Sequence, residues 1–404
     1  MRETSSAPKK KRRIGYWIFL GVVLLILGVQ YLLAQSRAVC DWYLDRVAPL
    51  FARSIGGLMS KIPAPVCEIT MIAAAVFCIV LVILLILLIF LRRREKYRRF
   101  VGFCVKLTLA VALVAVISEP IYSSIGNNST VLGKADYTAQ THDFDALTNL
   151  WNRWVRQANA LSVQVDRDEY GHIVQRSDSE IRDALQKAAE KLSAEYPRLG
   201  LPVPHAKTSA VSQLVAGMNI SAYYIEPWRE LVFTVGTQSR PRYPSVYAHE
   251  YSHFCGYHRE DEANYLGLLL CLASDDPNLR YEGLLDVRTL IWDAIVKEYF
   301  GDREPVYDDP DYLAFTETTE PFADAALMLG DMTGNYKLYH KQRGEENPED
   351  NRVDNPELIS SDKAKELIAK AGQKHSESVR NALGAHYYDG VVQLMLDLDI
   401  LTAE

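Results

Sequence analysis

The sequence predicts a mainly α-helical protein with a small β-sheet, carried on three transmembrane helices. Two observations predict this architecture. The first third of the 404-residue chain contains three long apolar stretches, and the rest alternates amphipathic helical patterns with two short β-prone segments. The chain beyond the last apolar stretch is long enough to fold around a core of its own.

The three apolar stretches are residues 14–33, 69–91 and 100–122, in a predicted membrane region of residues 1–122. Each has about 20 residues or more, the length that an α-helix needs to cross roughly 30 Å of hydrocarbon. Lys106 lies near the start of the third stretch, where its amine can reach the interface. We therefore expect all three stretches to span a lipid bilayer.

Basic residues next to these stretches predict the topology. Residues 9–13 are all basic, and the link at residues 92–99 is rich in arginine. Short basic flanks stay in the cytoplasm, so we expect a cytoplasmic N-terminus, with residues 34–68 and the chain after about residue 123 outside. The first stretch is long for a cleaved signal peptide, which favours an uncleaved anchor.

The chain after the membrane region divides into a linker and a domain. Residues 123–143 are polar and turn-rich, as expected of a linker, and residues 144–404 form the predicted extracytoplasmic domain. Residues 221–225 and 230–236 are β-prone and predict a hairpin or paired strands. Helical periodicity predicts helices at residues 144–163, 179–196, 260–274, 279–300, 320–332, 361–371 and 376–398.

Composition restricts the partners. The net charge of −7 and the isoelectric point near 5.8 argue against nucleic acid as a partner.

Among the six cysteines, Cys40 with Cys67 and Cys255 with Cys271 are possible pairs in an exported compartment. Their spacing forces neither pair, so the disulfide pairing stays open.

The motif HEYSH at residues 249–253 is the strongest functional signal. Pro244 suits the first turn of a helix and Gly256 the position just after its end, so we expect a helix over about residues 244–255. Residues four apart share a helix face, so His249 and His253 can hold one zinc ion. Glu250 beside them would act as general base for hydrolysis. The alternative is a surface helix with two solvated histidines.

The third zinc ligand is less obvious. HExxHxxG begins like the metzincin pattern HExxHxxGxxH, but the last ligand position holds Arg259, which cannot bind zinc. His258, Glu260 and Glu262 remain. We favour Glu260 and keep Glu262 as the alternative third ligand. An acid that binds no metal would still be favourable at the start of the next helix.

Glu260 begins a pattern similar to the gluzincin signature, in which a zinc-binding glutamate is followed four residues later by an Asp or Asn. That position here is Asn264, which would support a ligand histidine. Glu260 would also share a helix face with Ala263 and Gly267. Such small residues would let the second helix pack closely on the first.

The segment 217–267 resembles the DUF3810 family of bacterial membrane proteins, which are zincin-like predicted metallopeptidases. The resemblance rests on Tyr223-Tyr224, Pro227, Glu230, Pro244, HEYSH, Gly256 and the run REDEAN at residues 259–264. Residues 384–398 resemble the closing helix of the family more weakly. The resemblance implies a zincin-like α+β ectodomain and metal chemistry, and it implies no substrate.

The resemblance also implies a substrate-binding edge strand above the active-site helix, for which residues 231–235 are suited. An internal strand without a ligand role is the alternative. A donor for the transition-state oxyanion is also expected. The candidates, among which the sequence does not choose, are Arg259, Tyr336, Tyr339, His340, His386 and Tyr387.

We therefore expect a membrane-anchored zinc metallopeptidase that hydrolyses a peptide or protein substrate outside the cytoplasm. The alternative is a non-catalytic envelope binding or scaffold module that retains a zinc site. The intact Glu250 speaks against it, because a purely structural site needs no base. An intramembrane protease is disfavoured, because charged residues surround HEYSH and the nearby apolar run at residues 266–273 is too short to span a bilayer.

Overall fold

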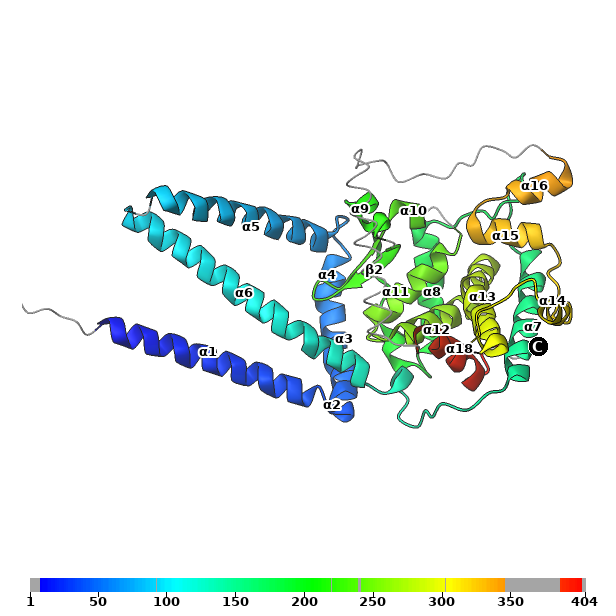
Figure 1. The fold of residues 1–404 in the computed structure, drawn as a ribbon, viewed down its shortest axis with the longest axis horizontal. Helices are drawn as coiled ribbons and strands as arrows, with labels where there is room; N and C mark the ends of the chain where they lie inside the picture. Colours follow the sequence, from blue (N-terminus) through cyan, green and yellow to red (C-terminus); the bar gives the residue numbers. More distant parts are fainter. Residues whose placement is uncertain are drawn as a thin grey trace, which may run out of the picture. The chain divides into compact units, whose positions relative to one another are not determined.

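The computed structural model describes residues 8–91, 93–218, 220–238, 241–301, 303–345 and 386–401. These residues form a mainly helical protein with one small three-stranded sheet (Figure 1), as predicted. The chain divides into two compact units. One contains Met1–Arg46 and Met71–Gly133, and the other contains Val47–Thr70 and Lys134–Glu404.

Long helices dominate the first unit. They are α1 (Pro8–Leu33), most of α5 (Val66–Leu91) and α6 (Glu95–Asn128), with the short α2 (Arg37–Trp42). The carboxylate of Asp41 accepts hydrogen bonds from the backbone N–H of Thr130 at 2.9 Å and from its hydroxyl at 3.0 Å. The side chain of Asn128 donates to the carbonyl of Ala34 at 3.1 Å. These bonds hold the end of α6 against α2 and against the residues that precede it.

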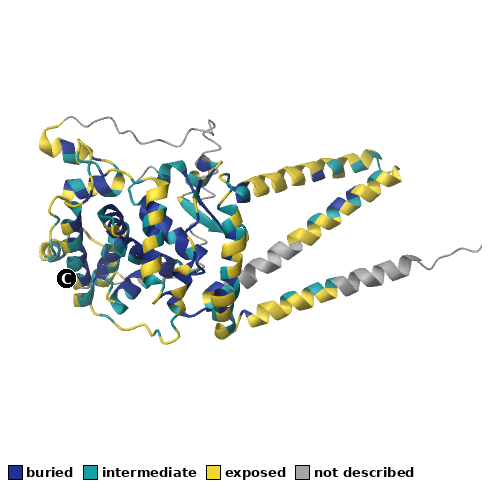
Figure 2. Cartoon of the chain, turned by 180° about the vertical axis from the view of Figure 1, so that it is seen from behind, coloured by how far each residue is buried: buried dark blue, intermediate teal, exposed yellow. Residues whose placement is uncertain are grey.

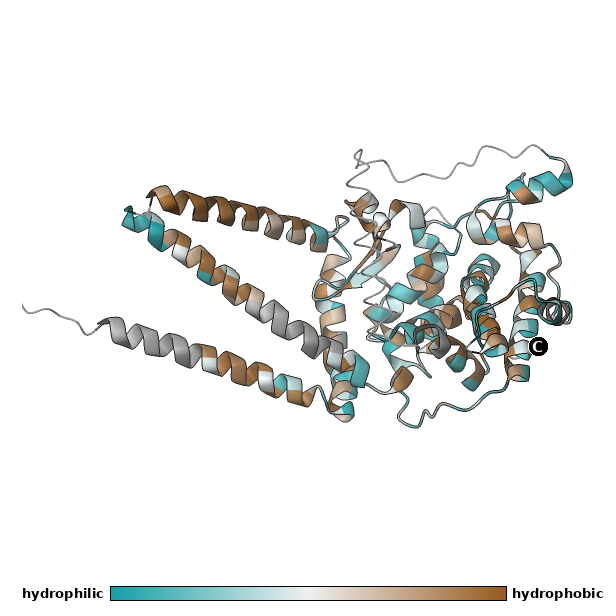
Figure 3. Cartoon of the chain, in the orientation of Figure 1, coloured by the Kyte–Doolittle hydropathy of each residue, from teal (hydrophilic) through white to brown (hydrophobic). Residues whose placement is uncertain are grey.

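Helix α5 is the described helix that is long and apolar enough by itself to cross a membrane. Its apolar side chains are largely exposed, as Figures 2 and 3 show, and Phe90 is 77% exposed. A second candidate consists of Leu20–Leu33 and Arg37–Met59, if this pair of helices, bent by 103°, is one span. The described residues thus contain one candidate span, or two with the bent pair.

The other two predicted spans, residues 14–33 and 100–122, fall within helices α1 and α6. The side chains of residues 8–19 and 113–123 lie outside the described part of the chain. The three-span arrangement and its topology therefore stay predictions. Membrane association through α5 is the part that the structure supports.

The second unit contains a core of helices, in which α11 packs on α12, α12 on α13 and α13 on α7, while α18 packs on α12 and α13. Its helices are α3 (Ala48–Phe51), α4 (Gly57–Met59), α7 (Phe144–Ser162), α8 (Asp178–Leu192), α9 (Ser212–Gly217), α10 (Val235–Gln238), α11 (Tyr243–Phe254), α12 (Glu260–Leu272), α13 (Pro277–Phe300), α14 (Pro310–Thr316), α15 (Ala325–Thr333), α16 (Lys337–Arg343) and α18 (His386–Asp397).

Local sequence explains where several of these helices begin. Ser177 and Glu180 form a reciprocal capping box at the start of α8. Asp143 accepts a hydrogen bond from the backbone of Ala146 and caps α7. Asp324 does the same for α15, which explains why this helix starts at Ala325 and not at the predicted residue 320.

Other helix predictions fare differently. The structure adds the short helices α14 and α16, which were not predicted. The predicted helix at residues 361–371 and the start of the one at 376–398 lie outside the described residues.

The sheet is built from β1 (Ala206–Thr208), β2 (Ala222–Ile225) and β3 (Glu230–Phe233), in the order β1-β3-β2. Strand β2 pairs antiparallel with β3, which confirms the predicted pairing, and β1 pairs parallel with β3. Strand β1 has only three residues, too few to show a pattern in the sequence.

The strand order corrects one expectation. The predicted substrate-binding edge strand was residues 231–235, but β3 lies in the middle of the sheet. Its backbone groups are directed at β1 on one side and β2 on the other, and all four of its residues are buried. A peptide cannot pair with a strand that already has two neighbours, and the chain has entered α10 by Val235.

All six cysteines are free thiols, and Cys40, Cys67, Cys255 and Cys271 are all buried. Neither pair that the sequence left open is bridged. Burial of a small apolar thiol is a sufficient packing role for these residues.

Candidate metal centre

Helices α11 and α12 form a tight antiparallel corner. Pro244 lies in the first turn of α11, as predicted, and Gly256 after its end has a φ of +95°, a conformation that favours glycine. The chain then turns back, and α12 packs on α11. At Gly267 a Cβ atom would lie 3.2 Å from the backbone nitrogen of His249. The small residue thus allows the close approach that the sequence predicted.

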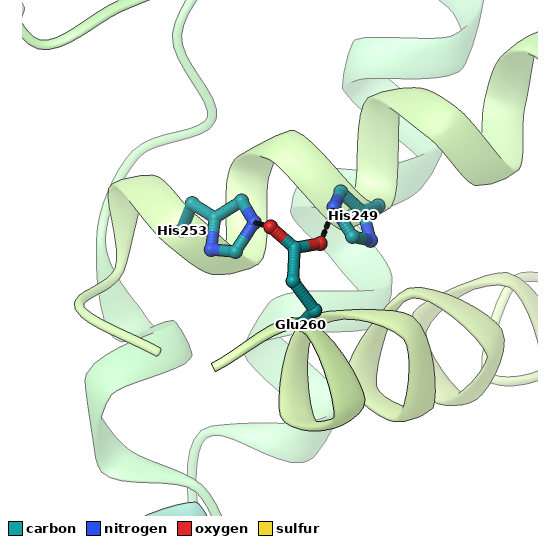
Figure 4. A group of neighbouring side chains, drawn as sticks. All are labelled: His249, His253 and Glu260. Atoms are coloured by element: carbon teal, nitrogen blue, oxygen red, sulfur yellow. Dashed lines mark ion pairs between the residues drawn. The ribbon is translucent and has the colours of Figure 1, made fainter. Parts of the chain in front are cut away.

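This packing brings three side chains together (Figure 4). The Nε2 atom of His249 lies 3.2 Å from Oε2 of Glu260, and Nε2 of His253 lies 3.6 Å from Oε1. The ligand atoms of all three residues lie within 4.8 Å of one another. The histidines come from one face of α11 and the glutamate from the first turn of α12.

Hydrogen bonds fix the orientation of both imidazoles. Nδ1 of His249 lies 2.9 Å from Oδ1 of Asn264, and Nδ1 of His253 lies 2.7 Å from the backbone oxygen of Tyr257. Because both partners are oxygen acceptors, each Nδ1 carries a proton and donates it. In the neutral imidazole this leaves the Nε2 lone pair directed at Glu260, the arrangement that second-shell partners impose on metal-binding histidines.

The donor set fits a divalent zinc ion. With metal–ligand bonds of about 2.0–2.2 Å and tetrahedral angles, neighbouring ligand atoms lie about 3.4 Å apart. The observed separations of 3.2 and 3.6 Å bracket this value. Two imidazoles and one carboxylate are also a set of three ligands that leaves a fourth position for water.

The three side chains form a triad of ion pairs. Burial lowers the pKa of His249, but the hydrogen bond and the negative charge of Glu260 outweigh this effect and raise the pKa to about 9. Burial raises the pKa of Glu260, but the two imidazoles hold it well below its usual range. The negative carboxylate thus attracts positive charge at this point, as a cation site requires.

Glu250 lies beside this group, one residue after His249 on α11, and is 6% exposed. Burial raises its pKa, whereas the neighbouring His249 and His253 act in the opposite direction. The backbone of Tyr224 in β2 forms a hydrogen bond with Glu250. A buried carboxyl group held in this way is suited to accept a proton at neutral pH.

The remaining candidate ligands lie elsewhere. Glu262 is 1% exposed and is not part of the described group, because residues two apart on a helix point to nearly opposite faces. His258 is also outside the group; burial, with the charges of His253, Arg229 and Arg198, lowers its pKa to about 3. The structure thus places Glu260, not Glu262 or His258, with the two histidines.

The candidate oxyanion donors have other contacts. The Nε of Arg259 donates to Asp261 at 3.0 Å, and the hydroxyl of Tyr336 donates to Asp331 at 2.9 Å. His340 contacts His172 and Glu345. The side chains of residues 386–389 lie outside the described part. The oxyanion donor stays unassigned.

Two groups that support the candidate metal centre could not be predicted from the sequence. The carbonyl of Tyr257 that accepts from His253 is a backbone atom, for which no sequence signal exists. Glu282 of α13 accepts a hydrogen bond from the backbone N–H of Arg242, at the start of α11, at 2.7 Å. Its role depends on how α13 packs on α11, which only the fold decides.

The sequence of this chain matches the model of one protein family. The model described as "Protein of unknown function (DUF3810)" matches residues 43–303, well over half of the chain. This chain belongs to the DUF3810 family. The matched region includes the sheet, α11 and α12, so the candidate metal centre lies within the family's own domain. No curated protein and no solved structure matches the chain.

Proposed function

We propose that this DUF3810 protein is a membrane-anchored zinc metallopeptidase. The observation that carries the proposal is the convergence of His249, His253 and Glu260 on one point, with the buried Glu250 beside them. Three ligands with room for water, next to an acid–base group, are typical of hydrolytic rather than structural zinc sites.

In this proposal His249, His253 and Glu260 hold the ion. Bound zinc would supply a Lewis acid that makes water more acidic and polarises the scissile carbonyl. Glu250 accepts the proton of the attacking water and delivers it to the leaving amine. Asn264 and the carbonyl of Tyr257 keep both imidazoles in the ligating orientation.

The substrate in this proposal is an extended peptide. Strand β2 is an edge strand, and the backbone of its Tyr224 reaches Glu250, so this strand borders the general base. A peptide that adds to the outer edge of β2 would therefore pass beside Glu250. This role replaces the one expected for residues 231–235.

For the location of the protein, we propose a multi-pass membrane protein with a cytoplasmic N-terminus and an extracytoplasmic catalytic domain. Helix α5 is the candidate span that supports membrane association. The basic residues 9–13 and the arginine-rich link at 92–99 support the orientation.

The test compares the full chain in detergent with Glu250→Gln and with the matched control Glu298→Gln, an exposed position on α13. We expect one zinc ion in all three proteins and cleavage of a mixed peptide library by wild type and the control. Loss of the general base should lower cleavage by Glu250→Gln about 10²–10⁴-fold.

Two results would overturn the proposal. Equal cleavage by Glu250→Gln and wild type would remove the base from the mechanism. An inactive wild type whose zinc has four protein ligands and no water would favour the non-catalytic envelope module.

A further inference from the structure

A second pair of histidines lies outside the candidate metal centre. His172 belongs to a hairpin in which Arg167 pairs with Ile173, and His340 lies on α16. Their Nε2 atoms are 2.9 Å apart. Helix α16 lies apart from α11 and α12 in Figure 1, so this pair is distinct from His249 and His253.

The other nitrogen of each imidazole faces a carboxylate. Nδ1 of His340 lies 3.1 Å from Oε2 of Glu345, and because a carboxylate only accepts, this Nδ1 carries a proton. Nδ1 of His172 lies 3.6 Å from Oδ2 of Asp168, whose negative charge favours a proton there as well. In the neutral imidazoles, both Nε2 lone pairs then lie on the side where the rings meet, and a cation bound by both nitrogens there removes the repulsion between the lone pairs.

We propose that Nε2 of His172 and Nε2 of His340 together bind a divalent transition-metal ion. With metal–nitrogen bonds of about 2.0–2.1 Å, two nitrogens 2.9 Å apart subtend an angle of about 90° at the ion. This is the angle between adjacent ligands in tetragonal or octahedral coordination, which Cu²⁺ and Ni²⁺ adopt with nitrogen and oxygen ligands. Water completes the coordination.

The surroundings hold both rings in place. Oδ1 of Asp168 accepts from the backbone N–H groups of Tyr170 and His172, both at 2.9 Å, which makes the hairpin turn rigid. The His172 ring stacks on Tyr336 with ring centres 4.1 Å apart. The side chain of His340 is 1% exposed and that of His172 is 24% exposed, so water and an ion can reach the pair from the His172 side.

The consequence is a metal clip between distant parts of the chain. The hairpin follows α7, whereas α16 comes near the end of the continuous described segment, 168 residues later. An ion that binds only when the two are together stabilises the folded state by mass action. The clip would therefore hold α16 against the hairpin.

The test counts ions on the full chain in detergent after dialysis against micromolar Cu²⁺. The variants are His172→Gln and His340→Gln, with His205→Gln as a control, since His205 contacts Arg182 elsewhere. We expect wild type and the control to bind one more ion per chain than either variant. The electron paramagnetic resonance spectrum of wild type minus that of either variant should show a two-nitrogen Cu²⁺ signal, because any signal from His249 and His253 is common to all the proteins.

A second readout separates metal loss from misfolding. Ni²⁺ should raise the unfolding temperature of wild type by about 2–4 °C more than that of His172→Gln, while both share the same unfolding temperature in chelator. Equal ion counts in wild type and His172→Gln, or an equal Ni²⁺ response, would overturn the proposal and leave a direct N–H···N bond between the two rings. Each test compares wild type with a variant that keeps His249 and His253, so its outcome does not depend on whether those two residues bind metal.

Discussion

The two histidine pairs follow one rule of orientation but come from different levels of structure. His249 and His253 lie one turn apart on α11, whereas His172 and His340 are 168 residues apart. In both pairs each Nδ1 faces an oxygen acceptor and each Nε2 faces the shared point. The comparison teaches that second-shell acceptors aim imidazoles in the same way, whether a helix or a long-range contact brings them together.

The two pairs of histidines differ in the carboxylates that lie near them. Glu260 adds a negative charge between His249 and His253, whereas the carboxylates near His172 and His340 lie behind the rings, at Nδ1. The first group thus offers three potential ligand atoms, and the second offers two. We call the group of His249, His253 and Glu260 the α11 site, and we expect it to bind divalent ions much more tightly than the pair of His172 and His340.

The largest expected effect tests this difference. Glu260→Gln removes the anionic ligand and should weaken zinc binding at the α11 site at least about 100-fold, whereas Glu262→Gln should leave it almost unchanged. Competition with a chelating dye measures both affinities. The opposite order would move the third ligand to Glu262.

A pH-dependent effect concerns Glu282, which supports the start of α11 and not the second pair of histidines. Burial raises the pKa of Glu282 to about 8 from an ordinary value of 4.5. The unfolded chain ionises at the lower value, so the contribution of this group to stability is full below about pH 4.5 and is lost as the pH rises towards 8. We expect a loss of a few kcal/mol across this window.

Glu282→Gln should flatten this part of the pH dependence, whereas Glu298→Gln at an exposed position of the same helix should leave it unchanged. Thermal unfolding in detergent at a series of pH values measures the difference. If wild type and Glu282→Gln lose stability in parallel between pH 4.5 and 8, the carboxyl group is not held neutral.

A smaller effect compares the acceptors behind the rings. Asn264→Ala removes the partner of His249 and should weaken zinc binding at the α11 site about 10–100-fold. Asp168→Asn should weaken Cu²⁺ binding at the second pair and leave the α11 site unchanged. Titration of each variant with both metals checks this. Loss at both sites from either single substitution would mean that the pairs are not independent.

The smallest expected effect concerns packing. Gly267→Ala adds a Cβ atom 3.2 Å from the backbone nitrogen of His249, where backbone has to shift, and should destabilise the fold by about 1–2 kcal/mol. Gly57→Ala, with nothing within 4 Å of the added atom, is the control and should be neutral or slightly stabilising. Chemical denaturation measures both, and equal stabilities would show that α12 moves without cost.

The local features of the α11 site could be predicted from sequence because helix geometry is regular. The spacing of His249 and His253 and the small residue at 267 follow from a repeat of 3.6 residues, and the turn at Gly256 follows from the positive φ that glycine tolerates. The same regularity predicted α5 and the pairing of β2 with β3. Each of these depends on neighbours within a few turns or one hairpin.

The sequence by itself determined the family, the mainly helical class, an apolar helix suited to a membrane and a helix that presents two histidines. Only the tertiary structure decided that β3 is central, that Glu260 faces the histidines and that His172 meets His340. Backbone geometry repeats along the chain and can be read locally. Strand order and long-range side-chain contacts depend instead on how all the elements pack, which no local pattern records.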